Sequence, residues 1–127
     1  MRLGGPVFED CDTPRRWADA LKRLGYRAAL CPVAADADEA TVADYAAAAA
    51  DADVVIADVV IAEVGAWSNT LIADEAPRRQ AVEYCIRRLD LAERVGARCC
   101  VNVAGSRAER KNDPHPENFS EATFELL

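Results

Sequence analysis

Short stretches of β-forming apolar residues alternate with longer stretches that carry apolar residues at helical spacing. Four apolar stretches are predicted to form strands, at residues 3–8, 26–33, 54–64 and 98–103. A helical pattern follows each of them, and no tight turn joins two strands directly. Strands separated by helices pair in parallel through right-handed crossovers, so the pattern predicts an α/β fold of four consecutive β/α units.

The predicted helices carry capping signals at their ends. Thr13, Asp38 and Ser120 each precede a helical pattern, as an N-cap residue does, and Gly25 suits the end of the first helix. The third helix is predicted to begin at Asp74 and to end at Gly96. Five of its residues recur at helical spacing and are predicted to form its buried stripe: Val82, Cys85, Ile86, Leu89 and Ala92.

The third predicted strand contains a tandem repeat. Residues 53–57 read Asp-Val-Val-Ile-Ala, and residues 58–62 repeat the same five residues. An insertion of odd length inverts the alternation of side chains, so both copies cannot present the same face in one strand. We expect the second copy to form the strand and the first to extend the preceding helix or loop out. The alternative is one long strand bent by a bulge.

Composition and charge exclude several functional classes. The chain of 127 residues has a net charge of −7 and no stripe of Lys or Arg, which argues against nucleic-acid binding. A hydrophobic fraction of 51% argues against disorder. No apolar stretch has the length of a membrane span or of a signal peptide. Five cysteines without a C-x-x-C spacing favour reduced thiols in the cytoplasm over a disulfide framework or a zinc site.

Polar residues follow the third and fourth predicted strands, at the edge where parallel α/β proteins place their sites. Glu63 is a candidate carboxylate beside a substrate or metal, and Trp67 is a candidate platform for the apolar face of a sugar. Asn69 and Asn102 have the donors and acceptors that bind hydroxyl groups. Arg107 suits a phosphate or carboxylate. Each also has a structural interpretation: a solvent-facing acid, a hydrophobic plug, ordinary loop asparagines and an exposed arginine.

Several segments together resemble the bacterial sugar phosphate isomerase/epimerase family, which belongs to the xylose isomerase-like barrel superfamily. The segments cover most of the chain and come in the order of that family: residues 3–8, 25–33, 61–69, 83–107 and 114–118. The resemblance implies that residues 1–127 form a single domain, half of a (β/α)8 TIM barrel. A complete barrel typically has about 250 residues. The four β/α units are then expected at roughly residues 2–25, 26–52, 53–97 and 98–127.

The resemblance also implies metal-assisted proton transfer on a small sugar or sugar phosphate. The family uses a divalent metal (Mn, Mg, Co or Zn) held mostly by later strands, while two glutamates move a proton. This chain is therefore expected to bind no metal alone and to be catalytically incomplete. Glu63, Trp67, Asn69 and Asn102 carry over as substrate-contacting positions.

Half a barrel exposes two sheet edges, so a homodimer that completes a barrel or a continuous sheet is expected. The alternative function is a non-catalytic α/β half-barrel that self-associates or binds another partner. A third possibility, an apurinic-site endonuclease, shares the barrel superfamily. The acidic net charge and the single histidine argue against it.

Overall fold

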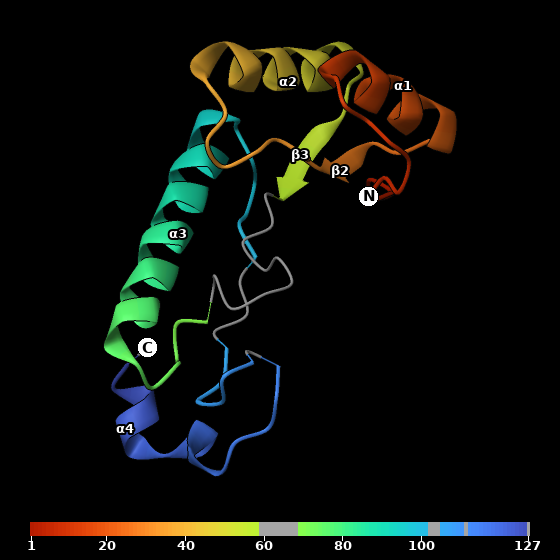
Figure 1. The fold of residues 1–127 in the computed structure, drawn as a ribbon. Helices are drawn as coiled ribbons and strands as arrows, with labels where there is room; N and C mark the ends of the chain where they lie inside the picture. The colour runs from red at the N-terminus through yellow and green to blue at the C-terminus, as the bar shows by residue number, and fades with distance from the viewer. Residues whose placement is uncertain (59–68, 102–104, 111, 127) are drawn as a thin grey trace. The chain divides into compact units, whose positions relative to one another are not determined.

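The computed structural model describes residues 1–58, 69–101, 105–110 and 112–126 (Figure 1). The chain divides into two compact units, which we describe separately. Unit 1 consists of Met1–Val60 and Arg88–Cys100, and unit 2 consists of Ile61–Arg87 and Val101–Leu127. Helix α3 (Glu75–Arg94) contributes its first part to unit 2 and its last part to unit 1.

Unit 1 contains a parallel sheet in which each strand pairs with the next one along the chain. Its strands are β1 (Gly4–Gly5), β2 (Ala28–Leu30) and β3 (Val55–Asp58), in the order β1-β2-β3. After α3 the chain runs along β3, because the amides of Arg98 and Cys99 donate to the carbonyls of Ile56 (3.0 Å) and Ala57 (3.1 Å). The predicted mixed α/β fold with parallel strands is thus confirmed for this part of the chain.

Two capped helices connect the strands of unit 1. Helix α1 (Pro14–Leu24) begins after Thr13, whose Oγ1 accepts a hydrogen bond from the Arg16 amide at 3.3 Å. It ends at Gly25, which has a φ of 70°, a left-handed conformation that glycine adopts readily. Helix α2 (Glu39–Asp51) begins after Asp38, whose Oδ1 accepts from the Thr41 amide at 2.8 Å. The predicted N-caps Thr13 and Asp38 and the predicted helix end at Gly25 are thus confirmed.

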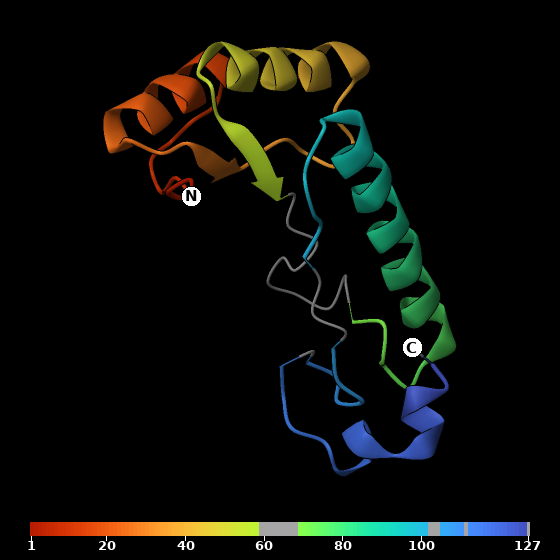
Figure 2. The same ribbon diagram turned by 180° about the vertical axis from the view of Figure 1, so that it is seen from behind.

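The helices of unit 1 cover one face of its sheet. One apolar cluster joins side chains of α1, α2 and the end of α3 to the alternating strand residues Ala29, Val54 and Ile56. At its centre the rings of Trp17 and Tyr45 meet edge to face, with centroids 5.6 Å apart. Figure 2 shows α1 and α2 from behind, both on the same side of β2 and β3.

The opposite face of the sheet is only half-buried. A shallow depression of about 290 Å³ lies against it and is lined mostly by small residues: Arg2, Gly4, Gly5, Pro6, Ala28, Ala29, Leu30 and Ala57. The described part of unit 1 therefore has a helix-covered face and an open, small-residue face.

The tandem repeat differs from our expectation. Its first copy neither extends α2 nor loops out but forms β3, in which Ile56 pairs with Ala29 of β2. The register then shifts, so that Leu30 pairs with Asp58 and Ala57 is the extra residue of a bulge. The second copy, apart from Asp58, lies outside the described residues. The first copy is favoured because its register with β2 turns Val54 and Ile56 into the apolar cluster.

The predicted buried stripe of α3 is largely wrong. Val82, Ile86 and Leu89 are 43%, 51% and 52% exposed, and Cys85 is half-buried. Only Ala92 of the predicted stripe is buried. The residues that α3 does bury lie on an adjoining face: Ala81, Arg88, Leu91 and Ala92. Apolar residues occupy two faces of this helix, and periodicity cannot tell which of them the rest of the fold covers.

Unit 2 contains the start of α3, the 3₁₀ helix η2 (Pro116–Phe119) and the short helix α4 (Glu121–Phe124). Ser120 caps α4, since its Oγ accepts from the Thr123 amide at 3.3 Å, which confirms the predicted start of the fourth helix. None of the helices that the structure describes is both long enough and apolar enough to cross a membrane.

Candidate functional site

A group of buried and half-buried polar side chains holds the loop that carries Arg107. We call Asn69, Ser106, Arg107 and Asn118 the Asn69 network; all four belong to unit 2. Asn69 is fully buried. Its Oδ1 accepts from the amides of Leu71 (3.3 Å) and Ser106 (3.0 Å), and its Nδ2 donates to the Ala108 carbonyl at 3.2 Å. One amide side chain therefore joins residues 69–71 to residues 106–108.

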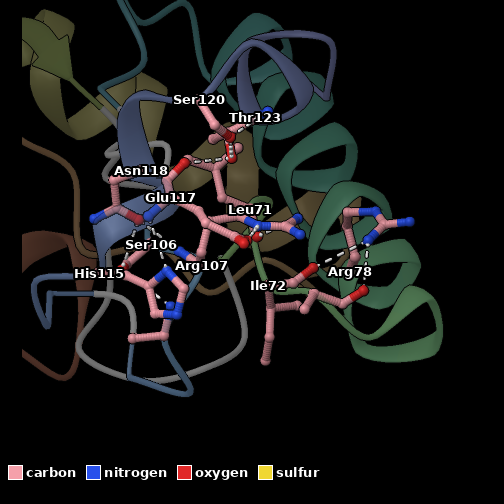
Figure 3. Close-up of polar contacts among 12 residues, drawn as sticks. Leu71, Ile72, Arg78, Ser106, Arg107, His115, Glu117, Asn118, Ser120 and Thr123 are labelled. Atoms are coloured by element: carbon pink, nitrogen blue, oxygen red, sulfur yellow. Dashed lines mark hydrogen bonds and ion pairs between the residues drawn. The ribbon is translucent and has the colours of Figure 1, made fainter.

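Ser106 and Asn118 hold the same loop from its other side (Figure 3). The buried Ser106 hydroxyl donates toward the Asp113 carbonyl at 2.6 Å and toward Asn118 Oδ1 at 3.1 Å, and it accepts from the Ala108 amide at 3.1 Å. Asn118 Oδ1 also accepts from the Arg107 amide at 2.8 Å. Buried polar groups of this kind are stable only when they are hydrogen-bonded, and here they order the loop backbone.

Arg107 is the least satisfied member of the network. Its side chain is only 17% exposed. Its Nη1 donates to the Leu71 carbonyl at 3.4 Å, whereas its buried Nε has no hydrogen-bond partner among the described residues. A carboxylate oxygen, Glu117 Oε2, lies 3.8 Å from Nε, which is an ion-pair distance but not a hydrogen bond. A guanidinium has five donors, and a largely buried cation with few partners is costly, so this site favours an additional anion.

His115 and Glu117 border the arginine through the short helix η2. His115 Nδ1 accepts from the Glu117 amide at 3.2 Å, so the imidazole caps the helix. The Glu117 side chain is 62% exposed. Since its contact with Arg107 is long and open to solvent, a better-placed anion can replace it.

The structure brings together two of the five predicted site residues. Asn69 and Arg107, from different predicted loops, meet through the contacts of residues 106–108. Glu63, Trp67 and Asn102 lie outside the described residues. Sequence analysis assigned no role to Ser106 or Asn118, because both are ordinary polar loop residues and nothing in their separation indicated that they meet.

Two of the cysteines of unit 1, Cys11 and Cys31, are poor nucleophiles. Burial raises the pKa of the Cys31 thiol to about 11, so it is protonated at neutral pH. Burial and, secondly, the Glu9 carboxylate raise the pKa of Cys11.

Among the described residues, no group of three or more His, Cys, Asp or Glu side chains is placed to hold a metal ion. They therefore offer no metal centre from which a catalytic step can be derived.

Comparison with known proteins identifies no relative. No protein-family model, no curated protein and no solved structure matches the chain.

Proposed function

We propose that this chain forms the first four β/α units of a barrel related to the sugar phosphate isomerases and epimerases. Two observations support it. Each strand of unit 1 pairs in parallel with the next strand in sequence, and α1, α2 and the end of α3 share one face of the sheet. Doubly wound open sheets instead reverse their strand order and carry helices on both faces. Sequential order with one helical layer is typical of a barrel wall.

The unsatisfied guanidinium of Arg107 is the single observation that supports a sugar phosphate as the substrate. In the described part of the chain its buried Nε has no hydrogen-bond partner, and its Nη1 donates one long hydrogen bond, to the Leu71 carbonyl. Arginine pairs with phosphate through two parallel hydrogen bonds, which matches the donors left over here. In this proposal Arg107 binds the phosphate of a small sugar phosphate, and Asn69 positions the loop that presents it.

The proposed reaction is metal-assisted proton transfer in an assembled barrel. Glu63, Trp67 and Asn102 contact the sugar in this proposal, and the chain alone is catalytically incomplete. A second copy of the chain, joined at the sheet edges, supplies the remaining β/α units. A divalent metal, when bound by such an assembly, polarises a substrate oxygen.

The role of Arg107 is tested by titrating the chain with ketose and aldose phosphates and following amide NMR shifts of residues 105–110. We expect saturable shifts, and a loss of affinity of about tenfold or more in Arg107→Ala, since a charged hydrogen-bond pair contributes about 1.5–3 kcal/mol. Arg110→Ala is the matched control, because Arg110 lies in the same loop and is exposed. Equal affinity of Arg107→Ala and wild type contradicts the proposal.

Turnover is tested separately, by assaying ketose–aldose interconversion with and without Mn²⁺ or Co²⁺. We expect no turnover by the monomer. Metal-dependent turnover by the monomer would contradict the proposed incompleteness while leaving the phosphate site in place.

A second candidate is a non-catalytic interaction module, and the open face of the sheet favours it. Gly5, Ala28, Leu30 and Ala57 line its 290 Å³ depression, a surface suited to larger apolar side chains of a partner. This candidate predicts self-association without any binding of sugar phosphates, so the same NMR titration distinguishes the two functions.

A further inference from the structure

Helix α3 carries an apolar stripe that is half-exposed among the residues that the structure describes. Val82, Ile86 and Leu89 are separated by four and three residues, so they share one side of the helix. Between 43% and 52% of each side chain is exposed. Because all three lie on a single helix (Figure 1), their arrangement follows from helical geometry alone.

The stripe lies away from the buried side of the helix. In unit 1, α3 buries Leu91 and Ala92 against the apolar cluster. At 100° per residue, both lie on a different side from Ile86. A contiguous exposed apolar surface of this kind, bordered by charged residues, marks an interaction site.

The charged residues beside the stripe are complementary to the same residues of a second, antiparallel copy of the helix. Arg79 precedes Ile86 by seven residues and Glu93 follows it by seven, and both are exposed on the same flank of the stripe. In an antiparallel pair of α3 helices centred on Ile86, Arg79 of each copy lies level with Glu93 of the other. A parallel pair would instead place Arg79 beside Arg79 and Glu93 beside Glu93, which is repulsive.

We propose that α3 binds a second copy of this chain in an antiparallel helix pair, with a two-fold axis at Ile86. The stripes of Val82, Ile86 and Leu89 then pack against each other, and one Arg79–Glu93 ion pair forms toward each end of the interface. Such an interface is isologous, since each copy uses the same surface. The contact of Arg79 with Glu75 at 2.7 Å within one helix is highly exposed and therefore weak, so it does not prevent the exchange of partners.

One helix pair is a small interface, so the dimer is expected to be weak and concentration-dependent. This surface differs from the sheet edges used by the proposed barrel, and neither proposal depends on the other.

Sedimentation velocity over a concentration series tests the helix pair. We expect wild type to shift toward twice the chain mass, and Ile86→Asp to weaken association by about tenfold or more, because it buries two like charges at the axis. Leu24→Asp on α1 is the matched control, because Leu24 is similarly exposed, at 44%, and is expected to leave association unchanged. Circular dichroism verifies that both variants stay folded.

Charge reversal tests the antiparallel orientation. Arg79→Glu and Glu93→Arg should each weaken the dimer, and the double variant should restore it to within about twofold of wild type. Three results overturn the proposal: a monomer at every concentration, a dimer insensitive to Ile86→Asp, or no recovery in the double variant. A dimer insensitive to Ile86→Asp that still binds sugar phosphates leaves the proposed function standing.

Discussion

At the scale of single residues, Asn69 shows how one side chain can order a loop. Its side chain forms three hydrogen bonds, to the backbone of residues 71, 106 and 108. Gly105 makes this contact possible. Its φ of 112° lies outside the range of most side chains, and an added Cβ would overlap Asn69 Oδ1. Glycine at this position is therefore required by conformation and by space.

We predict that Gly105→Ala lowers the free energy of unfolding by about 2–4 kcal/mol, because it adds backbone strain and breaks buried hydrogen bonds. Urea-induced unfolding followed by circular dichroism measures the change. Gly25→Ala is the control: its φ is 70°, but no atom lies within 4 Å of the added Cβ. We expect it to cost only about 1 kcal/mol. Equal costs for the two variants would refute the role of Asn69.

At the scale of elements, the helix ends of this chain depend on short polar caps. Asp38 caps α2, and the hydrogen bond from the Thr41 amide lowers the pKa of its carboxyl below the ordinary value of 3.8. A carboxylate whose pKa is lowered by folding stabilises the folded state above pH 3.8. That stabilisation is lost as the pH falls through the lowered value.

We predict that Asp38→Asn removes this contribution to the pH dependence of stability, because asparagine still accepts the hydrogen bond but has no charge to lose. Thermal unfolding midpoints of both proteins are compared from neutral pH down through 3.8. Wild type should lose more stability than the variant below that pH. Parallel curves for the two proteins would show that the cap is not coupled to protonation.

The pairing of β1 with β2 depends on a close approach at Gly4. A Cβ added there would overlap the Ala28 carbonyl oxygen, whereas at Gly5 the nearest atom, on the Tyr26 ring, is 3.6 Å away. We predict that Gly4→Ala costs about 1–3 kcal/mol of stability. Gly5→Ala should stay within about 0.5 kcal/mol of wild type. Chemical unfolding of the two neighbouring variants checks this, and equal effects would contradict the close pairing.

At the scale of the whole molecule, the two units are stabilised by different means. The interior of unit 1 is mostly apolar: Trp17, Leu21 and Leu91 are almost fully buried, and Arg88 is its buried charged residue among those described. The described interior of unit 2 contains the polar residues Asn69, Ser106 and Thr123, all at most 1% exposed. Substitutions that remove hydrogen bonds are therefore expected to affect unit 2 most, and substitutions that create cavities to affect unit 1 most.

Local signals in the sequence predicted the helix ends well. Thr13, Asp38 and Ser120 cap helices as expected, because a capping side chain bonds an amide only two or three residues away. The parallel pairing of the first three strands was also predicted, since strands joined by helices have few other ways to pair.

The sequence by itself thus determined what neighbouring residues decide: the order of the first three strands and the helices between them, the helix caps, and an acidic chain of α/β type. Only the tertiary structure decided which copy of the repeat pairs with β2, which face of α3 is exposed, and that Asn69 holds the loop that carries Arg107. Each of these depends on residues far apart in the chain. Their contacts are selected by burial and by space, and no local pattern of hydrophobic and polar positions encodes them.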